Sequence, residues 1–297
     1  MPSTYKADDA LKRLGVTAPL GVNAEGVHAF ECLRLLTGTV NLNHKRTGKT
    51  YPLRYCHLTE SRRKLKANSL KEIVETAFNS TLSLDEVSEY LNKTKSINRG
   101  YWENLRAELC LALAREYEAD HTGAFLHIYR LFEMSSVALP LFYATAEYDY
   151  SKALSFLKDL PSNPRDGDLA ILKKFSQVVA KEGGYNGFNI EVFYSKGDFT
   201  WDSRFADQIQ VCVVQQEKLK AVVDHAARKI DIPFDEMPSF IISFRNRLFH
   251  NTLSVKNFNL DHLGGANEVC EPLIKPALNW FTLVICAILQ QSIARYV

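Results

Sequence analysis

The sequence predicts a mainly α-helical protein with a small N-terminal α+β region and a loop-rich insertion. Apolar residues recur at helical spacing through most of the chain. Extended patterns are confined to two short stretches, 39–58 and 188–194. The last long apolar stretch, 276–290, predicts a buried terminal helix. Together these observations favour a helical core with little sheet.

The first hundred residues combine short helices with extended segments. Helical spacing of apolar residues predicts a helix over 24–36. Residues 39–58 indicate two extended segments around a basic turn that contains glycine. Helices are then predicted to begin near residues 69 and 83, and Ser83-Leu84-Asp85-Glu86 has the spacing of a capping box.

A polar stretch at 92–100 is the predicted boundary between an N-terminal region, residues 1–100, and a helical domain, residues 101–297. Two long helices are predicted at 102–118 and 121–146. The second is apolar over much of its circumference, so we expect it to be central.

The next stretch, residues 160–205, is rich in proline and glycine. It predicts a loop-rich insertion with a strand at 188–194. Helix is predicted to resume over 207–230. Pro233 and Pro238 then precede the helix that carries the motif described below.

Composition is that of an ordinary soluble globular protein. The 297 residues are 46% hydrophobic and 24% charged, with a net charge of +2. The chain is therefore no polycation, and a nucleic-acid surface requires local clustering of charge. No signal peptide is indicated at the start, and residues 276–290 are too short an apolar run to span a membrane. We expect a cytoplasmic protein without a membrane partner.

Six cysteines occur without a CxxC pair and without a histidine at zinc-finger spacing. We expect them to be reduced core residues and expect neither a metal site nor a cofactor. They are Cys32, Cys56, Cys110, Cys212, Cys270 and Cys286.

The most informative motif lies at 244–251, where Arg245, Asn246 and His250 interrupt an apolar helical pattern. Polar groups embedded in this way are costly unless they are paired or used. Arginine binds phosphate through a fixed fork of donors, and histidine moves a proton near neutral pH. Such a pair can cleave RNA without a metal. The alternative is a satisfied core network with no catalytic role.

Spacing alone is weak evidence. With 16 arginines and 8 histidines, roughly 0.4 pairs at this spacing arise by chance. A looser form of the pattern also matches Arg115 and His121, across a predicted helix break at Asp120. Requiring asparagine after the arginine lowers the chance expectation to roughly 0.02.

Helix geometry gives the motif a second property. Residues five apart are rotated by about 140° and separated by about 7.5 Å along the axis, so Arg245 and His250 do not share one narrow face. Asn246 and His250, four apart, do share a face. A second copy of the helix across a two-fold axis is one way to supply a complementary group.

Arg245-Asn246-Arg247-Leu248-Phe249-His250 resembles the RNxxxH signature of the HEPN superfamily, and Phe125–Glu133 resembles the YRxxE-like helix of phage-defence HEPN proteins. The resemblance covers about residues 101–297 and implies a HEPN-like helical bundle. It also implies a metal-independent endoribonuclease that acts as a homodimer, with two motifs meeting in one cleft.

The resemblance also implies roles for individual residues. His250 would be the general acid/base at the ribose 2′-OH or the leaving 5′-oxygen, and Arg245 would stabilise the phosphorane. Asn246 would orient His250 or the phosphate. Arg247 would grip a neighbouring phosphate or be simply solvated. Glu133 would direct Arg245, or form a structural salt bridge with Arg130 or another cation.

One departure concerns regulation. HEPN toxins that a nucleotidyltransferase neutralises often carry tyrosine two residues after the histidine, where this chain has Thr252. A toxic RNase needs restraint, so we expect a regulatory or trigger protein, or an inactive resting state.

A basic segment spans residues 43–71 and contains one acid, Glu60, among tyrosines and histidines. Cations beside stacking side chains suit single-stranded RNA, although a charge run is also typical of a solvated face. The predicted RNA-binding residues are Lys45, Arg46, Lys49, Arg54, Arg62, Arg63 and Lys64.

The sequence thus predicts a toxin-like ribonuclease of prokaryotic antiviral defence, an abortive-infection effector. Two alternatives remain. One is a non-catalytic HEPN module that binds RNA or a partner protein, and the other is an all-α scaffold.

Overall fold

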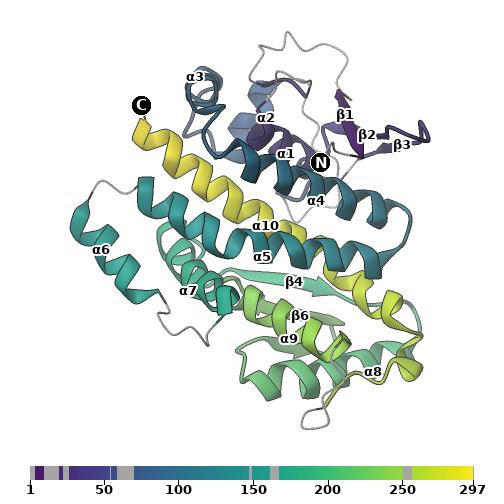
Figure 1. The fold of residues 1–297 in the computed structure, drawn as a ribbon. Helices are drawn as coiled ribbons and strands as arrows, with labels where there is room; N and C mark the ends of the chain where they lie inside the picture. The colour runs from purple at the N-terminus through teal and green to yellow at the C-terminus, as the bar shows by residue number, and fades with distance from the viewer. Residues whose placement is uncertain are drawn as a thin grey trace. The chain divides into compact units, whose positions relative to one another are not determined.

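The computed structural model describes residues 4–9, 20–22, 27–53, 55–58, 70–146, 149–160, 167–249 and 256–296. Over these residues the protein is mainly helical, with two small three-stranded antiparallel sheets (Figure 1). The predicted class is confirmed at this level. Contacts divide the chain into two compact units, residues 1–119 with 281–297, and residues 120–280.

The first unit contains one sheet and the shorter N-terminal helices. In the sheet, β2 pairs with β1 on one side and with β3 on the other. Helix α1 packs on α4, and α2 packs on α3. The elements are β1 (Tyr5–Asp9), α1 (His28–Leu36), β2 (Val40–His44), β3 (Thr50–Pro52), α2 (Leu70–Ala77), α3 (Leu84–Thr94), α4 (Arg99–Tyr117) and the end of α10 (Ala266–Tyr296).

The capping box and the hairpin that the sequence predicts in this unit are both present. The Ser83 hydroxyl accepts from the backbone N–H of Glu86, and the Glu86 carboxylate accepts from the Ser83 N–H, which completes the capping box. The two predicted extended segments form the β2–β3 hairpin, where Gly48 adopts φ +68° in the turn.

The second unit is built around α5, which packs against α7, while α9 packs against both (Figure 1). Its sheet has the order β4-β6-β5. The elements are α5 (His121–Ala146), α6 (Tyr150–Asp159), α7 (Gly167–Glu182), β4 (Asn189–Phe193), α8 (Phe199–Gln208), the π-helix η2 (Ile209–Gln215), β5 (Val222–Asp224), β6 (Lys229–Pro233), the short helix η3 (Phe234–Glu236), α9 (Met237–Phe249), the short helix η4 (Leu260–Leu263) and the start of α10.

Aromatic side chains fill the centre of this second unit. Trp280 stacks on Phe132 of α5 at 4.9 Å between ring centroids, and its indole N–H donates to the Phe234 carbonyl at 2.8 Å. Phe125 of α5 meets Phe244 of α9 at 5.1 Å. Buried aromatic pairs of this kind add to the stability that their area alone provides. The prediction that 121–146 is a central helix is confirmed.

Two predictions for this unit are wrong. Residues 160–205 are not a loop-rich insertion, because they contain α7, whose residues Leu172, Phe175 and Val179 are buried at helical spacing. The predicted strand there is present as β4. The predicted helix over 207–230 ends near residue 217, and a β-hairpin follows. Ile230 and Ile232 alternate with polar neighbours in that hairpin, which is a strand pattern.

The six cysteines all lie among the described residues, and each is buried and outside any disulfide bond, as predicted. One helix in the described part of the chain, α10, is long and apolar enough to cross a membrane. However, 67% of its most apolar 18-residue window is buried inside the protein, which is typical of a core helix.

Candidate functional site

Helix α9 carries three of the predicted site residues. Phe240, Ile241 and Phe244 are fully buried and fix the helix in the core. Arg245 and Asn246 follow on the half-buried side of its last turns. His250, directly after the helix, lies outside the described residues, as does Thr252. The described part of the site therefore contains the arginine and the asparagine but not the histidine.

Arg245 reaches the second stretch that the sequence singled out. Its guanidinium carbon lies 4.9 Å from the centre of the Tyr129 ring on α5. Its Nη1 donates to Asn246 Oδ1 at 3.2 Å. A cation over an aromatic face is stabilised by about 0.5–2 kcal/mol, depending on its exposure. The fold thus places residues from the two motif-bearing helices in contact.

Tyr129 was not among the predicted site residues, although it is the tyrosine of the stretch that resembles the YRxxE-like helix. Burial raises the pKa of Tyr129, the negative charge of the Glu133 carboxylate one turn away raises it further, and the positive charge of Arg245 opposes the rise. The hydroxyl therefore stays protonated at neutral pH. The tyrosine-to-glutamate spacing of four on one helix face was the available signal.

Glu133 is exposed and acts on this cluster through Tyr129. Its negative charge raises the pKa of the phenol whose ring carries Arg245. A direct ion pair between the two side chains stays a prediction.

Arg247 contacts the π-helix η2. Its Nε donates to the carbonyl of Cys212 at 3.2 Å, and its Nη2 lies 2.6 Å from a carboxylate oxygen of Glu217. The side chain is only 9% exposed, so the interpretation of Arg247 as a solvated arginine is wrong. A phosphate contact would compete with the ion pair to Glu217.

The chain after the motif is fastened to the same elements. The Phe258 N–H donates to the Arg247 carbonyl at 3.4 Å, and the Phe258 ring packs on Phe244 at 5.1 Å. The Cys212 thiol donates to the Asn257 carbonyl at 3.6 Å. Residues 257 and 258, which follow 250–255, are therefore bonded to η2 and to Arg247, which precedes 250–255. π-Helices occur frequently at functional sites.

The predicted RNA-binding residues fall partly outside the description. Lys45, Arg46 and Lys49 are exposed on the β2–β3 hairpin. The other four, Arg54, Arg62, Arg63 and Lys64, lie outside the described residues.

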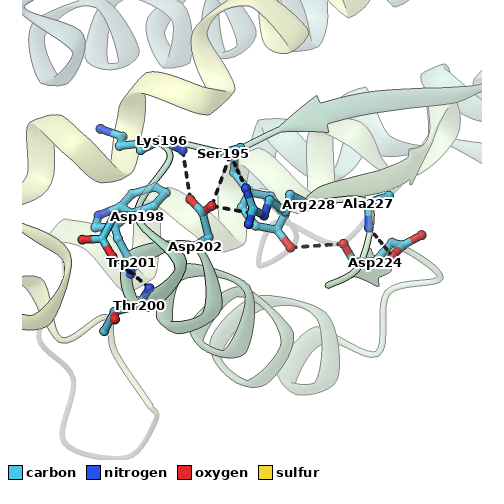
Figure 2. Close-up of polar contacts among 10 residues, drawn as sticks. Ser195, Lys196, Asp198, Thr200, Trp201, Asp202, Asp224, Ala227 and Arg228 are labelled. Carbon is cyan, nitrogen blue, oxygen red and sulfur yellow. Dashed lines mark hydrogen bonds and ion pairs between the residues drawn. The ribbon is translucent and has the colours of Figure 1, made fainter.

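A second polar cluster in residues 120–280 was not predicted (Figure 2). Asp202 of α8 is 2% exposed and accepts from the Lys196 backbone N–H at 2.9 Å and from the Ser195 hydroxyl at 3.2 Å. The Arg228 Nε lies 3.3 Å from the same carboxylate, and its Nη1 donates to Ser195. The cluster joins α8, the β4–α8 loop and the β5–β6 turn.

Lys196 extends the cluster in another direction, with its ammonium group turned away from Asp202 (Figure 2). That group pairs with Glu268 and, at 2.8 Å, with Glu271, and it lies 4.8 Å from the centre of the Trp201 ring. These carboxylates raise the pKa of Lys196 against the opposing effect of burial. The loop is therefore fastened to the first turns of α10.

No family model matches the chain, and no curated protein or solved structure matches it either. Within the described ranges, no group of three or more histidine, cysteine, aspartate or glutamate side chains is placed to hold a metal ion.

Proposed function

We propose that the protein is a metal-independent endoribonuclease of the HEPN type. The observation that carries the proposal is the meeting of the two motif stretches, where Arg245 and Asn246 of α9 lie against Tyr129 of α5. The two stretches were selected by sequence resemblance alone, and more than a hundred residues separate them along the chain. Nothing in the sequence required them to be neighbours in the fold. Their contact supports a common site.

The chemistry is that which the HEPN resemblance implies. His250 transfers the proton at the ribose 2′-OH and at the leaving 5′-oxygen, and Arg245 stabilises the negative charge of the phosphorane. The products are a 2′,3′-cyclic phosphate and a 5′-hydroxyl. Tyr129 holds the guanidinium on its ring face, which limits the directions in which Arg245 can point.

The test compares RNA cleavage by the wild type with that by His250→Ala and Arg245→Ala, in excess chelator. We expect cleavage by the wild type and a loss of at least about 100-fold in each variant. Cleavage by both variants at the wild-type rate rejects these residues, and loss of wild-type activity in chelator rejects the metal-free mechanism. RNA binding without cleavage by the wild type favours the non-catalytic HEPN module instead.

The same proposal includes a role as a toxin-like effector in antiviral defence, held in check by a regulatory protein or a resting state. Expression of the wild type should therefore slow bacterial growth, whereas His250→Ala should not. Harmless high-level expression of active wild type contradicts the need for restraint.

We further propose a homodimer that pairs α5 with α5. One side of this helix is exposed over four turns. Its apolar and charged residues recur at intervals of three or four residues, which is the spacing of a coiled-coil interface. An antiparallel pair with its two-fold axis between residues 131 and 132 places Arg130 opposite the second copy's Glu133, and Leu126 opposite the second copy's Val137. The exposed residues of the face are Leu126, Arg130, Glu133, Val137 and Leu141.

A charge swap tests this pairing by the mass measured in sedimentation or light scattering. Arg130→Glu and Glu133→Arg each place like charges opposite one another, and each should weaken the dimer by about tenfold or more. The double variant restores opposite charges and should restore dimerisation. A monomeric wild type, or two single variants that dimerise as tightly as it does, contradicts the pairing.

A further inference from the structure

The β2–β3 hairpin presents positive charge on a short, fully exposed turn. Lys45, Arg46 and Lys49 lie within five residues, and every residue from 45 to 50 is exposed. The turn contains no acidic residue. Clustered charge of this kind attracts a polyanion even though the net charge of the whole chain is only +2.

A carboxylate fixes this hairpin to the end of α4. Glu118 Oε1 accepts from Lys49 Nζ at 2.6 Å and from the Tyr51 hydroxyl at 2.9 Å. These two hydrogen bonds lower the pKa of Glu118, so the carboxylate is ionised at neutral pH. The hairpin and the last turn of α4 therefore form one connected surface.

Tyr117, the residue before Glu118, supplies an aromatic ring that contacts Tyr51 of the hairpin. Its ring makes an edge contact with Tyr51 at 5.5 Å, and Tyr51 in turn makes an edge contact with Tyr5 at 5.9 Å. Tyr5 and Tyr51 are buried, whereas Tyr117 is 50% exposed. One ring thus remains open to solvent on a support of two buried rings.

We infer that this surface, formed by Lys45, Arg46 and Tyr117, binds single-stranded RNA. An unpaired base stacks on the Tyr117 ring, and the neighbouring phosphates contact Lys45 and Arg46. Lys49 is engaged by Glu118 and acts mainly to hold the hairpin in place. Bases inside a duplex are already stacked on their neighbours, so double-stranded RNA lacks the stacking contact.

The inference deepens the proposed function, since it gives the ribonuclease a preference for unpaired RNA. The inference depends on the proposed function only where it treats the bound RNA as the substrate. Binding can be measured without cleavage, which keeps the two proposals separable.

The experiment measures fluorescence anisotropy of a short fluorescein-labelled oligouridylate with the full-length chain, in a His250→Ala background that prevents cleavage. Tyr117→Ala should weaken binding about tenfold, and Tyr117→Phe, which keeps the ring, should bind like the parent. Lys45→Ala/Arg46→Ala should weaken binding at low salt and reduce the dependence of log Kd on log salt by about 1.4.

The matched control is Lys173→Ala/Lys174→Ala, which removes two exposed cations from α7. It should leave the affinity within about twofold of the parent and change the salt dependence little. Because Lys45 and Arg46 lie on an exposed turn, their replacement tests the proposal even if Tyr117→Ala does not fold.

The inference is overturned if the parent does not bind, if the hairpin variants and the α7 control bind alike, or if duplex RNA binds equally well. Binding that depends on the hairpin in a protein that never cleaves RNA rejects the ribonuclease and leaves this site. Cleavage by the wild type together with hairpin variants that bind like the parent rejects this site and leaves the ribonuclease.

Discussion

The clusters around Asp202 and Arg245 both belong to residues 120–280, yet they use charge in opposite ways. Asp202 is buried, its two oxygens accept from a backbone N–H and a hydroxyl, and it forms an ion pair with a guanidinium (Figure 2). Two contacts of Arg245 are instead with a ring face and with an amide oxygen, groups that carry no formal charge. Arg245 is also partly exposed.

The difference lies in the groups that hold each charge. A buried carboxylate with matched donors contributes to one conformation, and an added ligand would displace existing bonds. A neutral ring stabilises a guanidinium by electrostatic attraction without cancelling its formal charge. Arg247, two residues away, resembles Asp202 in this respect, because Glu217 neutralises it.

The largest expected effect is on catalysis at Arg245. Arg245→Lys keeps the charge but loses the planar fork, so the rate of RNA cleavage should fall by about 10²–10³-fold. Thermal unfolding should change little, since the side chain is partly exposed. A lysine variant as active as the wild type contradicts a bidentate phosphate contact.

Substitution of Asp202 should instead affect the stability of the fold. Asp202→Ala leaves Ser195 and the Lys196 N–H without their acceptor and should lower the free energy of unfolding by about 3 kcal/mol in urea titration. The control is Asp207→Ala on the exposed side of the same helix, which should cost less than about 0.5 kcal/mol. Equal losses in the two variants would show that the buried network is not special.

Substitution of Arg247 tests whether its ion pair with Glu217 stabilises the fold. Arg247→Met keeps an apolar stem but removes the contacts with Cys212 and Glu217, so unfolding should become easier by about 2 kcal/mol. Arg204→Met, at an exposed position of α8, provides a matched control with little expected change. If Arg247→Met weakens only RNA binding, the phosphate-grip interpretation is preferred.

Tyr129 should show a smaller, ring-dependent effect on cleavage. Tyr129→Leu removes the face beneath Arg245 and should lower kcat about tenfold with less change in KM, whereas Tyr129→Phe keeps the face and most of the activity. Steady-state kinetics separate the two parameters. Similar losses in both variants would assign the effect to the hydroxyl bonded to Glu133.

The smallest effect is a pH dependence at Glu118. Hydrogen bonds from Lys49 and Tyr51 lower its pKa in the folded state, so the stabilisation is present above the ordinary value near 4.5 and disappears as the pH falls through the lowered value. The difference in thermal midpoint between wild type and Glu118→Gln should therefore shrink on acidification. A pH-independent difference excludes this origin.

Much of the helical structure could be predicted because its signals are local. The limits of α5 follow from apolar spacing and from the break at Asp120, whose side chain accepts from the Gly123 N–H at 2.9 Å. The capping box at Ser83 and the hairpin around Gly48 are equally local. The predictions for 160–205 and 222–230 were wrong because polar and turn-forming residues in these stretches obscure the periodic pattern of buried apolar residues.

The candidate site was predictable only in part. Arg245 and Asn246 could be chosen from the motif, and 125–133 from a second resemblance. Tyr129 as the support of Arg245, and Glu217 as the partner of Arg247, depend on contacts between segments far apart in sequence. A single sequence contains no direct record of such pairs.

The sequence by itself determined the helical class, the burial of the cysteines and the presence of an arginine-asparagine pair on one helix. Periodicity and capping act over three or four residues, so they can be read along the chain. The tertiary structure alone decided that α9 lies against α5, that Arg247 contacts a π-helix, and that Glu118 joins a basic hairpin to α4. These pairings depend on how distant surfaces fit together, which no local pattern specifies.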